Sequence, residues 1–454
     1  MARVLLVAFS CCPGMGSEAG IGWNFALGLC RRHDVTLLTT DEFRPQIDAW
    51  RAAHPEAPLR VVYRNVALPR WLMFKSYPTA NIYYYAWQFS AALAARRLHR
   101  RQPFDIAHHV NWGRYWMPSA AAFAGAKFVW GPIGAAEGAA ASMLEGMSLR
   151  GRFSERVRDF MRWLFEHDPF TRYTARRADA VLAATYETAD KLRRWGVSGM
   201  EVVCSVGIAE KDLPLPSVAN SSTTSDGQPS DPAYACISIG RLLNWKGFHL
   251  GLRAFARSGL PARGARYAVA GEGPEEARLR QLAQALGIAG HVDFLGHLPR
   301  EKCLRVLARA RMLVHPSLHD SGGFVLVEAM ALGRPVVCLD VGGPAVIVDE
   351  HSGVKIRARD ADDAVAQLSG AMTRLHDDPP LYDRLSRGAL ARGRGEFLWS
   401  RKMEQVDAVY DRLLGRAAAA APQGETAGDS PAQATLGGGG SFAVSSEQSG
   451  KVVA

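Results

Sequence analysis

The sequence lacks the marks of several protein classes. None of its apolar runs reaches the ~18 residues that a membrane-spanning helix requires. Its seven cysteines are odd in number, scattered, and include no Cys-x-x-Cys pair, which argues against a disulfide framework and a zinc ribbon. Neither G-x-G-x-x-G nor a phosphate-binding loop follows the first apolar run, so a nicotinamide cofactor and nucleotide hydrolysis are poorly supported. A protein of the reducing cytoplasm fits these absences best.

The composition is that of a packed enzyme-sized protein. The chain has 454 residues, of which 48% are hydrophobic and 22% are charged, which is enough to bury a large core. Its net charge is 54 − 44 = +10. This excess favours an anionic partner such as a phosphorylated ligand, an acidic lipid surface or a nucleic acid.

Strand-length apolar runs alternate with helix-length periodic segments, a pattern typical of parallel sheets with crossover helices. The opening run fits a buried strand better than a signal peptide, because it leads directly into a glycine-rich turn. Two segments rich in turn formers or small residues, 213–232 and 415–454, predict a linker and a disordered tail. The expected strands are 4–9, 35–39, 104–110, 128–130, 180–184, 233–239, 267–270, 292–295, 312–315 and 335–339.

This alternation predicts two doubly wound α/β domains, 1–212 and 233–395, with a cleft between the carboxyl ends of their sheets. Glycines 14–22 follow the first strand and place N–H groups at a helix start, where a phosphate is stabilised; a tight turn that needs small residues explains them too. In the second domain, Arg241 and Lys246 follow a strand. They can neutralise a diphosphate leaving group, or they are two solvated charges.

The most informative stretch is 315–331. A strand ends near His315, a glycine-containing turn holds Asp320, and an apolar helix from 324 to 332 holds Glu328. A carboxylate inside so apolar a helix needs hydrogen-bond donors, and sugar hydroxyls are suitable ones.

Two other acidic or histidine-rich patterns do not predict a metal site. Pro316 prevents a regular helix from aligning His315 with His319 and Asp320. An Asp-x-Asp pair at 360–362 precedes a helical pattern, so helix N-capping explains it better than metal binding.

In this order the motifs resemble those of family 4 glycosyltransferases with the GT-B fold, in which two Rossmann-like domains face each other across a cleft. The resemblance covers nearly all of residues 1 to 412. It rests on GSEAGIG at 16–22, GRLLNWKG at 240–247, AGEGP at 270–274, FLGHLPREK at 294–302, the Asp-x7-Glu element DSGGFVLVE at 320–328, and AMALGRPVV followed by DVGGPAVIV.

The resemblance implies transfer of a sugar from a nucleotide-sugar with retention and without a metal ion or other cofactor. Asp320, Arg241 and Lys246 would be the catalytic residues, and a helix at 396–414 would return to the first domain. The implied donor-binding residues are Gly16, Arg241, Lys246, His297, Leu298, Asp320, Gly322, Gly323, Phe324, Val325 and Glu328.

This chain departs from the family pattern at two positions. Asp320 stands where the family usually has Glu, so its carboxylate is one methylene shorter. The histidine that many members carry near the transferring sugar is absent from the Trp130-Gly131-Pro132 turn, a trait shared with a branch that assembles surface polysaccharides. Glu137 or His109 could contribute to the sugar or acceptor site instead, although His108 and His109 face opposite ways on a strand and at most one can do so.

Two segments bear on the acceptor and on the membrane. Residues 150–165 form a basic amphipathic pattern, and residues 71–89 are rich in aromatics. Ordinary core packing with solvated arginines explains both segments. The sharper interpretation is contact with the inner face of the cytoplasmic membrane, where a polyprenyl-linked glycan would be the acceptor.

We therefore expect a cytoplasmic, peripherally membrane-bound hexosyltransferase of surface-glycan synthesis. A sugar-nucleotide epimerase or a phosphorylase on the same fold is the alternative, because both share the phosphate chemistry. Nucleic-acid binding is disfavoured, since the arginines are spread along the chain without a recognised binding module.

Overall fold

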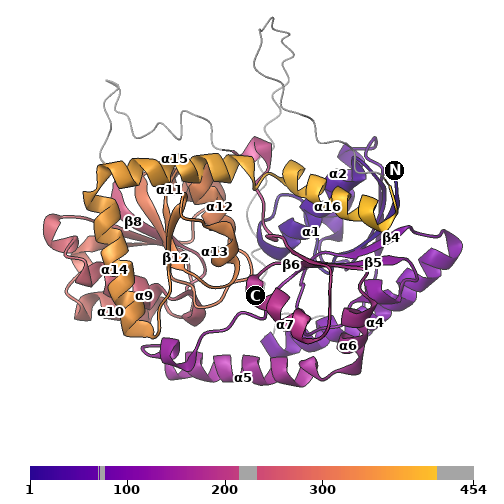
Figure 1. Ribbon diagram of the computed structural model, residues 1–454, viewed down its shortest axis with the longest axis horizontal. Helices are drawn as coiled ribbons and strands as arrows, with labels where there is room; N and C mark the ends of the chain where they lie inside the picture. The colour runs from indigo at the N-terminus through magenta and orange to yellow at the C-terminus, as the bar shows by residue number, and fades with distance from the viewer. Residues whose placement is uncertain (70, 72–76, 214–232, 417–454) are drawn as a thin grey trace, which may run out of the picture.

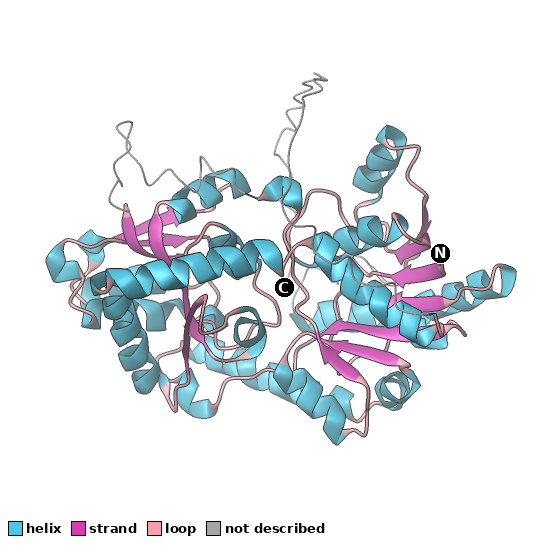
Figure 2. Cartoon of the chain, turned by 45° about the horizontal axis from the view of Figure 1, so that its top comes forward, coloured by secondary structure: helices cyan, strands magenta, loops and turns pink. Residues whose placement is uncertain are grey.

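The computed structural model describes residues 1–69, 71, 77–213 and 233–416. They form two α/β units side by side, each built on a parallel sheet with helices around it (Figures 1 and 2). The predicted fold class is therefore confirmed. The predicted linker, apart from Leu213, and the predicted tail beyond Arg416 lie outside the described residues.

Within the described residues the first sheet has seven strands, in the order β3-β2-β1-β4-β5-β6-β7. β1 is central, and Val4 to Val7 are fully buried, so the opening apolar run is a core strand as predicted. The strands are β1 (Arg3–Val7), β2 (Asp34–Thr39), β3 (Leu59–Tyr63), β4 (Ile106–His109), β5 (Lys127–Ile133), β6 (Ala180–Ala183) and β7 (Met200–Val202).

The helices of the first unit include a long one, α5, that lies along the lower edge of the molecule and reaches beneath the second unit (Figure 1). It contains the predicted amphipathic segment. The helices are α1 (Ser17–Cys30), α2 (Arg44–Ala53), α4 (Tyr77–Arg101), α5 (Leu149–Glu166), α6 (Pro169–Arg177) and α7 (Tyr186–Arg194).

The aromatic segment 71–89 is largely a core element. Residues 72–76 lie outside the described part, but Tyr83, Tyr84 and Trp87 of α4 are at most 1% exposed. Phe9 of the first unit packs edge-on against all three rings. The prediction of membrane contact here is therefore wrong for these three residues, because helical spacing turns them toward the sheet.

The second sheet shows six strands in the described chain, in the order β10-β9-β8-β11-β12-β13. They are β8 (Tyr234–Ile239), β9 (Tyr267–Ala270), β10 (Val292–Gly296), β11 (Ala310–His315), β12 (Val336–Leu339) and β13 (Gly353–Ile356). The helices around it are α9 (Phe248–Arg257), α10 (Glu276–Ala285), α11 (Arg300–Ala308), α12 (Phe324–Ala331), α13 (Gly342–Ile347), α14 (Ala361–Asp377) and α15 (Pro379–Gly395).

Asp360 acts as a helix cap. Its carboxylate accepts a hydrogen bond from the N–H of Asp363 at 2.8 Å, at the start of α14. This contact satisfies a backbone donor that a helix start leaves unpaired. The capping interpretation of this acidic pair is confirmed.

Near Leu398 the chain crosses back to the first unit and continues as α16 (Trp399–Leu413), which lies against α1. Asp407 of α16 accepts hydrogen bonds from Arg32 at 2.5 Å and from His33 at 2.8 Å. Tyr410 pairs through its hydroxyl with His108 Nδ1 at 2.6 Å. These contacts bind α16, which follows the second unit in the chain, to the first unit.

Candidate functional site

A cavity of about 370 Å³ lies between the two units. The first unit contributes the start of α1 at 16–19 and the segments that follow β4 and β5, including Trp112 and Pro132. The second unit contributes Arg241, which follows β8, and Ser321, which follows β11. The carboxyl ends of both sheets therefore converge on one space, and the predicted phosphate-binding groups Gly16 and Arg241 share its wall.

Lys246 and Asp320 form an ion pair; neither lines this cavity, but Asp320 directly precedes Ser321 of its wall. The Lys246 ammonium lies 2.5 Å from Asp320 Oδ2, and His315 Nε2 lies 3.4 Å from the same oxygen. Burial alone would raise the pKa of the Asp320 carboxyl, but the Lys246 charge and the nearby His315 imidazole outweigh it and lower that pKa below its ordinary value. Both residues were expected among the catalytic residues, and the structure places their charged groups in direct contact.

The turn after Asp320 leads into α12. Gly323 has φ +141°, a conformation that favours glycine, and α12 starts at Phe324. The N–H groups of 322–325 lie at this helix start, the position that an anion favours. Gly322 and Val325 are half-buried, and donor binding by this segment stays a prediction.

Glu328 lines a second cavity, of about 570 Å³, which Gly16 and the start of α16 also line. Its carboxylate pairs with Arg300 at 3.0 Å. His297 and Leu298, two of the predicted donor-binding residues, follow β10 and line neither cavity. The N–H of His297 donates to Glu272 at 3.2 Å.

Glu137 is buried where the two units meet. Its carboxylate accepts hydrogen bonds from the Ser321 hydroxyl, from the N–H of Ala135 at 3.2 Å and from the Thr185 hydroxyl at 3.3 Å. The sequence analysis offered Glu137 as one of two candidate contacts to the sugar or the acceptor. In the structure it joins the turn after β5 to the turn that carries Asp320.

The structure does not bring His109 to the cavity. Its side chain is buried, with Nδ1 3.1 Å from the Ser119 hydroxyl and Nε2 3.4 Å from the Tyr84 hydroxyl. Burial, with the neighbouring His108, lowers the pKa of His109 to about 3. His109 therefore packs in the core of the first unit, and the prediction that it contacts the sugar or the acceptor is wrong.

The sequence analysis missed the segment 111–114 after β4, which forms part of the cavity wall. Glu18 of α1 accepts a hydrogen bond from the N–H of Trp112 at 2.8 Å, and burial raises the pKa of the Glu18 carboxyl. The Arg114 guanidinium lies 4.8 Å from the centre of the Trp112 ring. Position alone would have identified this segment, because it follows a central strand at its carboxyl end.

Comparisons with known proteins agree with this geometry. The family description "Glycosyl transferase 4-like domain" matches residues 23–205, and "Glycosyl transferases group 1" matches residues 225–392. An alpha-D-kanosaminyltransferase of Streptomyces kanamyceticus is 25% identical over 245 residues, which are 53% of this chain and 62% of that protein. The chain spans about half the length of the curated relatives it matches.

Two solved structures share the arrangement of the units. A sucrose-phosphate synthase from Thermosynechococcus elongatus superimposes with a TM-score of 0.60 at 18% identity, covering 91% of this chain and 100% of that one. Anabaena HepE, solved with UDP and glucose, gives a TM-score of 0.58 at 16% identity with the same coverage. These likenesses establish the GT-B class of fold. With the two family matches, the chain belongs to glycosyltransferase family 4.

Proposed function

We propose that the protein transfers a hexosyl group from a nucleoside-diphosphate sugar to an acceptor hydroxyl, with retention of the anomeric configuration. The observation that carries this proposal is the cavity that Arg241 and Ser321 of the second unit line together with Gly16 and Trp112 of the first. Membership of a family of sugar transferases supports the same chemistry.

The reaction follows from the charges around this cavity. Arg241, Lys246 and the N–H groups at the start of α12 stabilise the negative charge that develops on the departing diphosphate. The bond between the anomeric carbon and the phosphate oxygen breaks while the acceptor oxygen bonds to that carbon from the same face. The acceptor proton passes to the departing phosphate oxygen. No metal ion is needed, because fixed cations supply the positive charge.

A two-step experiment tests the transfer. Nucleoside-diphosphate sugars based on UDP, GDP, ADP and dTDP are screened for thermal stabilisation of the protein, since a ligand of the folded state raises its melting temperature. The stabilising donor is then incubated with and without an alcohol acceptor, and the product is examined by proton NMR. An acceptor-dependent product with the donor's anomeric configuration is expected. Donor conversion without an alcohol acceptor would favour an epimerase or a phosphorylase instead.

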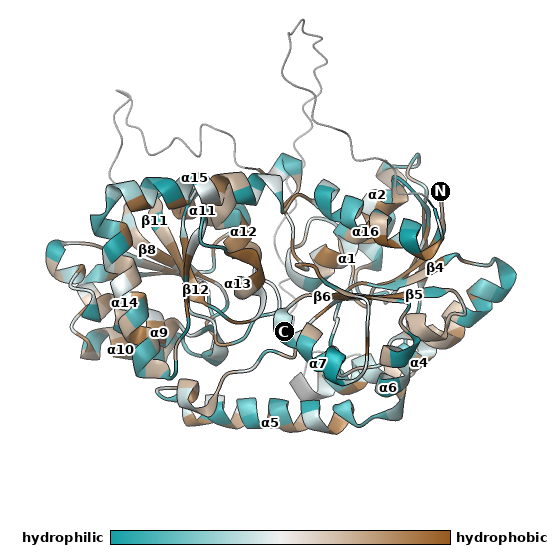
Figure 3. Ribbon diagram, in the orientation of Figure 1, coloured by the Kyte–Doolittle hydropathy of each residue, from teal (hydrophilic) through white to brown (hydrophobic). Residues whose placement is uncertain are grey.

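The exposed side chains of α5 support the proposal that the acceptor is bound at a membrane. Leu149, Phe153, Phe160 and Trp163 are between 57% and 82% exposed, and the arginines of 150–156 on this helix are exposed as well. Figure 3 shows α5 banded in hydrophobic and hydrophilic colours along the lower edge. Exposed aromatics beside exposed cations suit an anionic bilayer. We therefore place the acceptor, a polyprenyl-linked glycan of surface-polysaccharide synthesis, at a membrane. No helix of the described ranges is long and apolar enough to span one.

Vesicle sedimentation tests this surface. The triple variant Phe153→Ser, Phe160→Ser, Trp163→Ser should lose at least tenfold in partitioning onto vesicles containing phosphatidylglycerol, because it removes most of the apolar area. Leu93→Ser on α4 is the matched control, since Leu93 is 54% exposed but lies on another helix. Equal binding by the triple variant and the control would contradict this placement.

A further inference from the structure

The first turns of α5 and the segment before it are bound to the second unit. Met143 and Met147 pack in the apolar core of that unit. The Ser142 hydroxyl donates to the carbonyl of Arg359 at 2.8 Å, and the Ser148 hydroxyl donates to Glu275 at 3.1 Å. Although α5 belongs to the first unit by sequence, its first half therefore lies against the second unit, which carries the Arg241 and Lys246 that we assign to the donor diphosphate.

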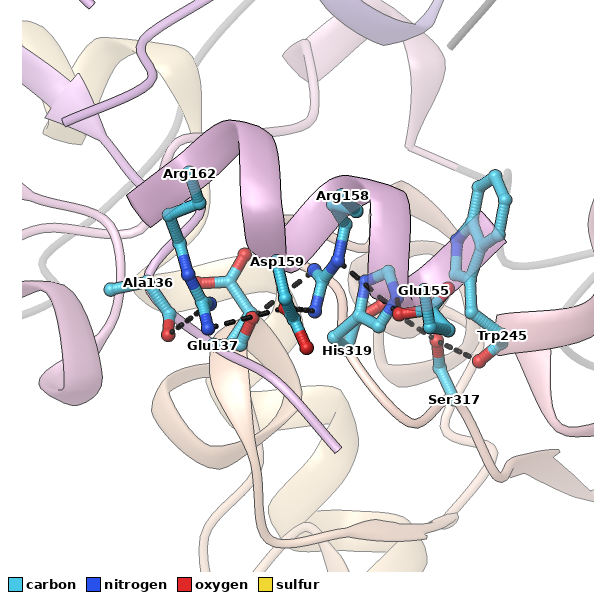
Figure 4. Close-up of polar contacts among 9 residues, drawn as sticks. All are labelled: Ala136, Glu137, Glu155, Arg158, Asp159, Arg162, Trp245, Ser317 and His319. Atoms are coloured by element: carbon cyan, nitrogen blue, oxygen red, sulfur yellow. Dashed lines mark hydrogen bonds and ion pairs between the residues drawn. The ribbon is translucent and has the colours of Figure 1, made fainter. Parts of the chain in front are cut away.

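Glu155 of α5 is buried at this contact, with 3% of its surface exposed. Its Oε2 lies 3.0 Å from His319 Nε2 in the second unit and 3.2 Å from Arg158 Nε in α5 (Figure 4). Burial would raise the pKa of the Glu155 carboxyl, but the His319 hydrogen bond and the nearby positive charges lower it. Glu155 is thus a charged group whose partners come from both units.

His319 in turn joins the two turns on which the donor site depends. Its ring stacks on Trp245, with centroids 5.6 Å apart and planes 15° from parallel. The Trp245 carbonyl accepts hydrogen bonds from the N–H of Leu318 at 2.8 Å and from the Ser317 hydroxyl at 3.4 Å. The next residue of each turn forms the Lys246–Asp320 ion pair. A displacement of His319 would therefore change the relative positions of Lys246 and Asp320.

A second chain of contacts holds the other side of Asp320. From α5, Arg162 donates to the carbonyl of Ala136 at 3.2 Å and Arg158 donates to that of Glu137 at 3.3 Å, as Figure 4 shows. The Glu137 carboxylate then accepts from the Ser321 hydroxyl. Both neighbours of Asp320, His319 and Ser321, are consequently held by groups of the first unit that contact or belong to α5.

We propose that Glu155 is a positioning residue of the donor site. By holding His319 on Trp245 across the interface between the units, it fixes the turns that carry Lys246 and Asp320. The inference rests on the proposed function and goes beyond it, because Glu155 touches neither cavity. Displacement of catalytic groups by about 1 Å can cost on the order of a hundredfold in rate, so a contact outside the cavity can govern turnover.

Glu155→Ala tests the proposal, with Asp159→Asn as the matched control. Asp159 lies on the same helix and pairs with Arg158 and Arg162, but its side chain is 50% exposed and does not reach His319. We measure dissociation constants for UDP, GDP and ADP by calorimetry, kcat and KM for the donor, and the melting temperature. Glu155→Ala should weaken binding of the nucleotide that the wild type binds by about tenfold, a typical coupling between contacting groups, and should lower kcat. Asp159→Asn should stay within twofold, and Glu155→Gln, which keeps an acceptor oxygen, should recover most of the loss.

A double-mutant cycle separates positioning from a general loss of stability. His319→Phe keeps a ring to stack on Trp245 but removes the Nε2 donor. Adding Glu155→Ala to His319→Phe should change nucleotide affinity by less than twofold. The proposal is overturned if Glu155→Ala has the same effect in both backgrounds, or if it lowers only the melting temperature. A wild-type protein that binds none of the three nucleotides would refute the proposed function itself, and this inference with it.

Discussion

Replacing Lys246 by Met removes the cation that we assign to the donor diphosphate and leaves the Asp320 carboxylate without its ion-pair partner. Removing one partner of a buried pair costs about 3–5 kcal/mol, largely because the remaining charge is unpaired. The Asp320 side chain is 19% exposed and His315 stays within 3.4 Å, so part of that cost is offset. We expect a loss of about 2–3 kcal/mol in the free energy of unfolding, which corresponds to a fall of several degrees in melting temperature.

The double variant Lys246→Met, Asp320→Asn distinguishes stability from catalysis. With no charge left unpaired, its melting temperature should return close to that of the wild type. Its turnover should stay about a hundredfold or more below the wild type, because the fixed cation that stabilises the leaving group is still absent. Calorimetry gives the melting temperatures, and release of the nucleoside diphosphate gives the turnover. Wild-type stability in the single variant would show that the ion pair does not stabilise the fold, and wild-type turnover in the double variant would show that Lys246 does not stabilise the leaving group.

Three further predictions concern pH, the last helix and metal ions. Burial, with the charges of Arg278 and Arg253, lowers the pKa of His249 to about 3. As the pH falls below about 6.5, His249 therefore takes up a proton only in the unfolded wild-type chain, which lowers the free energy of unfolding of the wild type. The free energy of unfolding of His249→Phe, measured relative to that of the wild type, should rise by about 2 kcal/mol between pH 7.5 and pH 5. A difference that does not change with pH would contradict this. Asp407→Ala should lower the melting temperature through a loss of about 1–3 kcal/mol, since Arg32 and His33 lose their acceptor; an unchanged melting curve would be the contrary result. Turnover should survive an excess of EDTA, and a loss restored by Mg²⁺ would count against charge neutralisation by the protein alone.

The central strands of both sheets were predictable because each is a compact apolar run between turn formers. The strands missed by the sequence analysis, β3, β7 and β13, all lie at sheet edges. β7 is only three residues long and includes Glu201, and β13 includes Lys355. Edge strands bury less of their surface, so their hydrophobic pattern is too weak to separate them from loops.

The wall groups Gly16 and Arg241 were predictable because both follow strands whose carboxyl ends meet at the cleft. The contact between Glu155 and His319 was not, since the two residues are 164 positions apart and meet only through the packing of one unit on the other. The contact between Glu137 and Ser321 was missed for the same reason. Sequence periodicity locates a residue on its own element but carries no information about which distant element it touches.

A crystal structure of the protein with its donor nucleotide would show whether groups from both units enclose a diphosphate. We expect diphosphate oxygens within hydrogen-bond distance of Arg241, Lys246 and the N–H groups that begin α12, with the 16–19 turn on the opposite side. A nucleotide bound away from the space between the units, or one whose phosphates contact neither cation, would contradict it.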